Sequence, residues 1–181
     1  MSRPSQVIVL GEDERHARFA RQYLLRLGVS GHAIRVESQP AGRGCGEQWV
    51  RQQYATQVRA CRARNTRAAT KLVVVIDADT NTVERRSDQL SAALHEAGLE
   101  PRHPSESVSH FIPKRSIETW ILCLGGRPVD EVADLSGHRD VEAMVLSSVR
   151  TFFEWTRPNA MPPGHCVPSL LAAVPEARRL E

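Results

Sequence analysis

The chain has 181 residues, of which 41% are hydrophobic, and carries a formal net charge of +3 from 24 basic and 21 acidic residues. This length and composition fit one domain that folds alone around a proper core. The longest apolar runs are far too short to span a bilayer, and the first residues lack the layout of a secretory signal peptide, so we expect a cytoplasmic protein.

Strands alternate with helices over the first two thirds of the chain. An apolar strand at 6–10 leads into a helix closed by Gly28, and an alternating strand at 32–38 is followed, after a glycine-rich loop, by a helix over 47–64. The run 72–76 is the strongest strand, because its β-branched residues fit a position buried on both faces of a sheet. A third helix ends at Gly98, a weaker strand spans 107–113, and an apolar helix covers 116–124 with Ser116 as its N-cap.

This alternation predicts an α/β fold. We expect a doubly wound sheet of about four mainly parallel strands with helices on both faces. Residues 1–125 would form this core, and the proline-punctuated segment 126–181 would form a small helical C-terminal extension packed on it.

Acidic residues follow three of the predicted strands: Glu12, Asp13 and Glu14 after the first, Asp77 and Asp79 after the third, and Glu118 after the fourth. Ligands of such sheets lie beyond the carboxyl ends of the strands, so we expect these carboxylates to meet in one crevice. Gathered carboxylates repel one another unless a cation lies between them, and oxygen ligands without a Cys or His cluster favour Mg²⁺ or Mn²⁺. The alternative is that the acids only cap helices.

A metal held in this way usually completes its shell with substrate phosphates, which predicts phosphoryl chemistry and, most readily, phosphodiester cleavage by a metal-activated water. Lys114, just past the fourth strand, would then neutralise charge on the scissile phosphate; otherwise it is a solvent-exposed loop lysine. The seven histidines share no ligand-like spacing, and we expect most of them at the surface.

Seven basic residues lie between positions 43 and 71, against one acid, Glu47. Clustered arginines attract polyanions and bind phosphate oxygens through two nitrogens at once. We therefore expect a nucleic-acid-binding group in this segment, made of Arg43, Arg51, Arg59 and Arg62. The alternative is a solvated, arginine-rich helix face.

These motifs resemble the TOPRIM fold over roughly residues 6–124. The shared features are an acidic glycine turn after the first strand, the Asp77-x-Asp79 pair after a later apolar strand, and the segment "IPKRSIETWIL". The fold is shared by topoisomerases, primases, OLD-type nucleases and small TOPRIM-like proteins of bacterial anti-phage defence. The resemblance implies Mg²⁺-dependent nucleic-acid cleavage, often alongside a partner ATPase. It also implies that Asp77 and Asp79 hold metal, that Glu118 is a further site acid, and that Glu14 matches the acid that opens the first helix.

The sequence departs from the family at position 10. The family's first motif ends its strand with Glu directly before Gly, and here that position is Leu10. Either the acid has moved to Glu12, which a glycine turn allows, or it has been lost. We expect Glu12 to act as the ligand.

Two other functions remain open. The segment "VVVIDADT" resembles the opening of haloacid-dehalogenase phosphatases, in which the first Asp is a nucleophile and the second an acid/base. The protein could also be a catalytically inactive module that binds nucleic acid or a protein partner, with Leu10 as the sign of the lost activity.

Overall fold

A computed structural model describes residues 5–37, 39, 45–65, 68–135 and 137–181. Four parallel strands form one sheet in the order β2-β1-β3-β4: β1 is Gln6–Gly11, β2 is Ile34–Glu37, β3 is Thr70–Val75 and β4 is Val108–Phe111. The expected α/β fold with a parallel sheet is confirmed.

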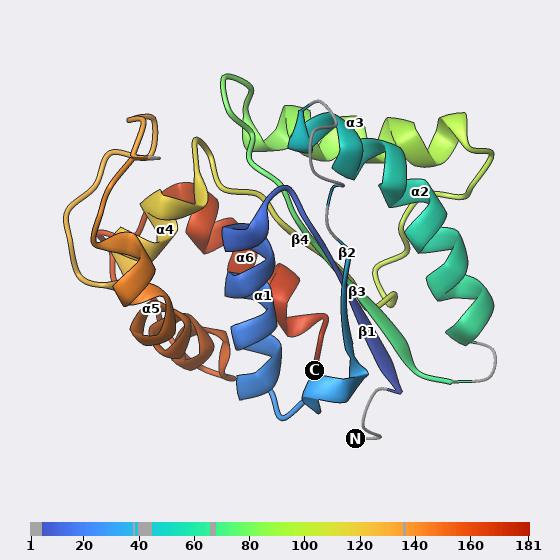
Figure 1. The fold of residues 1–181 in the computed structure, drawn as a ribbon, viewed down its shortest axis with the longest axis horizontal. Helices are drawn as coiled ribbons and strands as arrows, with labels where there is room; N and C mark the ends of the chain where they lie inside the picture. The colour runs from blue at the N-terminus through green and yellow to red at the C-terminus, as the bar shows by residue number, and fades with distance from the viewer. Residues whose placement is uncertain (1–4, 38, 40–44, 66–67, 136) are drawn as a thin grey trace.

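Helices cover both faces of this sheet (Figure 1). Their bounds are α1 Glu14–Arg26, α2 Gly46–Asn65, α3 Val83–Glu96, α4 Ile117–Leu124, α5 Val141–Thr156 and α6 Pro168–Arg178, with a short 3₁₀ helix at Gly31–Ala33. Helices α2 and α3 lie on one face, and α1, α4, α5 and α6 lie on the other. Gly28 and Gly98 follow α1 and α3 with φ angles of +83° and +66°, the left-handed conformation that commonly ends a helix. Ser116 stands at the N-cap of α4, but among the described residues its hydroxyl makes no hydrogen bond.

The two central strands divide their side chains between two hydrophobic clusters. Ile8 and Leu10 of β1 pack against α2, while Val7 and Val9 pack against α1 and its neighbours. Successive strand residues point to opposite faces, and both faces are covered, so apolar residues stand at consecutive positions, 7–10 in β1 and 72–75 in β3, rather than at every second one. This explains why the sequence of β3 reads as a continuous apolar run.

The C-terminal segment adds two helices to the α1 side of the sheet. Helix α5 packs on α4 and α1, and α6 packs on β4. Phe152 of α5 joins an aromatic group with Phe19, Tyr23 and Trp120, and the Trp120 indole donates a hydrogen bond to the Ser169 hydroxyl of α6 (2.9 Å). Residues of α5 and α6 thus belong to the same hydrophobic cluster as β1 and β3. No helix in the described ranges has the length and apolar composition needed to cross a bilayer.

Leu10, where the TOPRIM resemblance has Glu, has no exposed surface and contributes to the cluster beneath α2. A carboxylate there would be buried in this apolar cluster. We predict that Leu10→Glu lowers the free energy of unfolding by more than about 3 kcal/mol, whereas Leu10→Met changes it by less than about 1.5 kcal/mol. Urea denaturation of both variants measures this. Equal stability of Leu10→Glu and wild type would contradict the packing.

His110 of β4 is buried, and its Nε2 lies 2.8 Å from the hydroxyl of Tyr54 on α2. Burial, followed by the nearby Arg102 guanidinium, lowers the pKa of His110 to about 3, against an opposing contribution from Glu176. In the unfolded chain this histidine has a pKa near 6.5 and is protonated below that pH, whereas in the folded chain it stays neutral down to about pH 3.

Stability should consequently fall as the pH drops below about 6.5, by up to about 1.4 kcal/mol per pH unit from this group. In His110→Gln that contribution disappears, so the stability difference between variant and wild type should narrow as the pH falls from 6.5 to 5. Carboxylates shared by both proteins cancel in this difference. Chemical denaturation at several pH values measures it, and parallel stability curves would refute the burial of a neutral histidine.

Candidate metal centre

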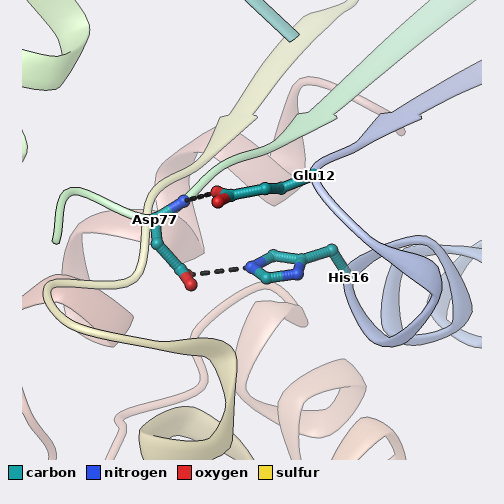
Figure 2. A group of neighbouring side chains, drawn as sticks. All are labelled: Glu12, His16 and Asp77. Atoms are coloured by element: carbon teal, nitrogen blue, oxygen red, sulfur yellow. Dashed lines mark hydrogen bonds and ion pairs between the residues drawn. The ribbon is translucent and has the colours of Figure 1, made fainter. Parts of the chain in front are cut away.

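Three potential ligands meet at the carboxyl ends of the central strands. Glu12 follows β1, Asp77 lies two residues beyond β3, and His16 lies in the first turn of α1. One ligand atom of each lies within 4.8 Å of those of the other two. Figure 2 shows Glu12 and His16 both reaching from the β1–α1 segment toward Asp77. Because β1 and β3 are adjacent and parallel, residues 65 positions apart in sequence meet here.

The backbone of the β1–α1 turn fixes the position of Glu12. Its N–H donates to the Val75 carbonyl at 3.1 Å, and one of its carboxylate oxygens accepts from the Asp77 N–H at 3.1 Å. A side chain on Gly11 would place a Cβ 2.9 Å from the backbone nitrogen of Ala17, so the close approach of α1 requires glycine there. A Cβ on Gly46 would come within 2.5 Å of the Glu12 carbonyl, which puts the start of α2 against the same turn.

His16 is 2% exposed and bridges two carboxylates. Its Nδ1 lies 2.8 Å from Asp13 Oδ1, and its Nε2 lies 2.9 Å from Asp77 Oδ1. Asp13 is also the N-cap of α1 and accepts from the His16 backbone N–H. Burial alone would lower the pKa of His16, but Asp77 and Asp13 together raise it well above its usual value.

The surroundings of Glu12 and Asp77 disfavour the charged form of both carboxyl groups. Burial, then repulsion from Asp77, raises the pKa of Glu12 to about 7. Burial also raises the pKa of Asp77, with Glu118 and Asp79 adding to the effect and His16 opposing it. Asp13 behaves differently: burial would raise its pKa, but hydrogen bonds and charge from His16 hold it well below its usual range. Positive charge is needed between Glu12 and Asp77 for both to ionise.

Arg86 of α3 braces the turn that carries Asp77, and the sequence analysis did not identify it. It is 2% exposed; its Nε donates to the Asp77 carbonyl at 2.8 Å, and its Nη1 pairs with Glu47 in the first turn of α2. Its Nη2 lies 3.8 Å from Asp79 Oδ2. Asp79 itself has φ +56°, a left-handed conformation that is uncommon outside glycine, and its side chain is about half exposed (48%). Asp79 therefore lies beside Arg86, outside the group formed by Glu12, His16 and Asp77.

The other predicted site residues lie around this turn. Lys114 Nζ donates to the carbonyls of Asn81 (2.7 Å) and Asp79 (3.3 Å), so it holds the backbone of the turn. Glu118 is 4% exposed, near enough to Asp77 to affect its pKa, and pairs with Arg15 of α1. Glu14 is exposed at the start of α1.

Three of the four predicted nucleic-acid-binding arginines, Arg51, Arg59 and Arg62, are spread along α2. The fourth, Arg43, lies outside the described residues. Arg51 pairs with Glu47 at 2.6 Å, near the centre. Arg59 donates to the Ala97 carbonyl, and Arg62 binds Glu106 and the carbonyls that follow α3. A helix rises about 1.5 Å per residue, so Arg62 lies roughly 24 Å along α2 from Gly46 and the centre. The structure thus brings Arg51 close to the centre and leaves Arg59 and Arg62 far from it.

His16 is the member of this possible metal-binding group that sequence reasoning missed. Most histidines were expected at the surface, and four of the seven are exposed, but His16 and His110 are buried. The available signal was the spacing Asp13-x-x-His16 at a helix start, which puts an N-cap carboxylate beside a first-turn side chain.

The chain was also compared with known proteins: no family model, no curated protein and no solved structure matches it.

The contacts of Arg86 allow a direct test of how the centre is held together. Removal of one member of a buried ion pair weakens the compensation of the other charge, and Glu47 without Arg86 would depend on its contact with the more exposed Arg51. We predict that Arg86→Met costs about 3 kcal/mol of stability, and that the double variant Glu47→Gln/Arg86→Met loses at least about 1 kcal/mol less than the sum of the two single losses. Urea denaturation of all four proteins measures this coupling.

The matched control is Arg85→Met, which makes the same substitution at the exposed neighbouring position of α3. It should change stability by less than about 0.5 kcal/mol. Additive losses in the Glu47 and Arg86 variants would show that the pair does not join α2 to the Asp77 turn.

Proposed function

We propose that this protein is a divalent-metal-dependent nuclease of TOPRIM type, which hydrolyses phosphodiester bonds at the centre formed by Glu12, His16 and Asp77. The observation that carries the proposal is the meeting of two carboxylates and an imidazole beyond the ends of adjacent parallel strands. Ligands of open α/β sheets bind at this edge, and a cation there would allow both carboxylates to ionise.

Mg²⁺ or Mn²⁺ bound there would activate a water and stabilise the leaving oxygen. Glu12 and Asp77 would hold the ion, and Glu118, buried beside Asp77, would act as a further site acid once Arg15 contacts the substrate phosphate. Asp79 stands at the same turn and, with its exposed carboxylate, would face substrate or a second ion. Lys114 supports the site through its bonds to the carbonyls of residues 79 and 81, a positioning role; direct neutralisation of phosphate stays a prediction.

The nucleic-acid substrate, the partner ATPase, the role in anti-phage defence and the cytoplasmic location rest on the TOPRIM resemblance and on composition. Arg51, which lies one helical turn from Glu47, is the member of the basic group best placed to contact nucleic acid at the centre. Arg59 and Arg62 would bind phosphate only at the far end of α2.

A catalytically inactive binding module is the second candidate, and one observation favours it. Both buried site acids already have a cationic partner within the chain, since Asp77 contacts His16 and Glu118 pairs with Arg15. A chain that neutralises its own carboxylates does not require a metal for charge balance.

The decisive measurement is cleavage of end-labelled single- and double-stranded DNA and RNA by the full chain, with Mg²⁺ or Mn²⁺ and with a chelator as control. We predict metal-dependent cleavage that falls at least about 100-fold in Asp77→Asn, because changes outside the ligand shell already cost about 10- to 100-fold. The matched control Asp88→Asn alters an exposed acid of α3 and should retain activity. Undiminished cleavage by a folded Asp77→Asn would refute the assignment. Binding of nucleic acid without cleavage in any metal would favour the inactive module.

A further inference from the structure

Asp13 orients the imidazole ring of His16 through the ring nitrogen that points away from the centre. Asp13 lies outside the three-ligand group, and one of its carboxylate oxygens lies 2.8 Å from His16 Nδ1. The other ring nitrogen, Nε2, faces Asp77 at 2.9 Å (Figure 2). A carboxylate that binds one nitrogen of a histidine while the other nitrogen faces a metal is the usual outer-shell arrangement of metal-binding histidines. His16 is 2% exposed and belongs to a helix that Asp13 caps, so the ring has little freedom to turn away.

We propose that the centre binds a divalent first-row transition ion, of which Mn²⁺ is the probe, through His16 Nε2 and one oxygen each of Asp77 and Glu12, and that Asp13 is the positioning residue for His16. The proposal deepens the metal centre of the proposed function and does not depend on nuclease activity. It differs from the sequence-based expectation, which placed Asp79 in the ligand set and no histidine.

The donor atoms decide the class of ion. Mg²⁺ prefers oxygen ligands in a near-ideal octahedron and keeps several waters, whereas imidazole suits first-row transition ions. Mn²⁺ accepts both carboxylate and imidazole, and affinity for such a mixed site should rise from Mn²⁺ to Co²⁺. A centre with one nitrogen and two carboxylate donors therefore discriminates against Mg²⁺.

The geometry fits an ion of this size. Two neighbouring ligands of an octahedral ion with bonds of about 2.1 Å lie about 3.0 Å apart. The observed separation of His16 Nε2 and Asp77 Oδ1 is 2.9 Å, so both atoms already have the spacing of adjacent ligands. Glu12, whose carboxylate accepts from the Asp77 backbone N–H, would supply the third ligand, since its oxygen lies within 4.8 Å of the other two ligand atoms.

The other candidate ligands have different partners. Glu118 pairs with Arg15, and the Asp79 carboxylate lies 3.8 Å from Arg86 Nη2. Each would have to leave a guanidinium to reach the ion. His16, by contrast, would exchange only its Nε2 contact with Asp77 for the bond to the ion, while Nδ1 keeps its bond to Asp13.

The test is metal binding by the metal-stripped full chain without nucleic acid. Calorimetric titration with Mg²⁺, Mn²⁺ and Co²⁺ gives the affinities, and pulsed electron paramagnetic resonance of the Mn²⁺ complex reports whether a histidine nitrogen is coordinated. We expect Mn²⁺ to bind at least about 10-fold more tightly than Mg²⁺, Co²⁺ to bind more tightly still, and nitrogen coupling in wild type.

Variants separate the roles of the two residues. His16→Gln should lose the nitrogen coupling, while Asp13→Asn should weaken Mn²⁺ binding about 10- to 100-fold and keep the coupling. The control His95→Gln, at an exposed position of α3, should match wild type in both. If His16→Gln fails to fold, the spectrum of wild type alone decides, since a nitrogen ligand is either present or absent.

Two results overturn the inference: an Mn²⁺ complex without nitrogen coupling, which means an all-oxygen site, or no binding of any ion, which makes His16 a structural partner of Asp13 and Asp77. An all-oxygen site leaves the nuclease assay to be judged on its own, whereas a chain that binds no ion would also count against metal-dependent cleavage at this centre. Conversely, tight Mn²⁺ binding with nitrogen coupling but no cleavage supports the ion assignment and refutes the nuclease.

Discussion

The close approach of Glu12 and Asp77 is the constraint on which the rest of the site depends. Adjacent parallel strands end at the same edge, so the residues that follow β1 and β3 are brought together whatever their charge. Two carboxylates in a poorly solvated place repel each other, and the protein offsets this with donors: the Asp77 N–H to Glu12, and His16 to the Asp77 carboxylate. Arg86 adds a third donor through the Asp77 carbonyl. The turn is thus held by backbone and cationic contacts before any ion or substrate arrives.

These donors come from both faces of the sheet. His16 belongs to α1 on one face, whereas Arg86 and its partner Glu47 belong to α3 and α2 on the other. The centre therefore joins two layers whose hydrophobic clusters are otherwise separated by the sheet. Glycine at positions 11 and 46 lets α1 and α2 approach the Glu12 turn closely enough for this. The charge balance of the site consequently depends on the backbone of the turns and on the packing of the helices against them.

Most of the fold could be predicted from the sequence, because it depends on local patterns. The β-branched run of β3, the glycines that end α1 and α3, and the alternation of strands and helices all have short-range signals. The parallel topology then predicts the meeting of Glu12 and Asp77 at one edge. His16 and Arg86 were beyond this reasoning. A histidine or arginine on a helix is usually solvated, and the partners that these two have when buried include Asp77, which comes from another part of the chain.

Whether the centre holds an ion depends on a competition for the lone pairs of Asp77. A protonated His16 satisfies Asp13 and Asp77 at once, as a cation shared between two carboxylates, while Glu12 accepts a hydrogen bond from the Asp77 backbone N–H. A divalent ion offers twice the charge, reaches Glu12 as well, and releases the imidazole proton, while Asp13 keeps its bond to the other nitrogen. Asp13 can thus bind His16 both when the imidazole is protonated and when it coordinates an ion. Glu12 is the residue whose contacts would differ between these two states. Glu12 receives a hydrogen bond from the Asp77 backbone and lies in the same group as His16, so its charge is the one that a divalent ion would stabilise beyond what a shared imidazole proton provides.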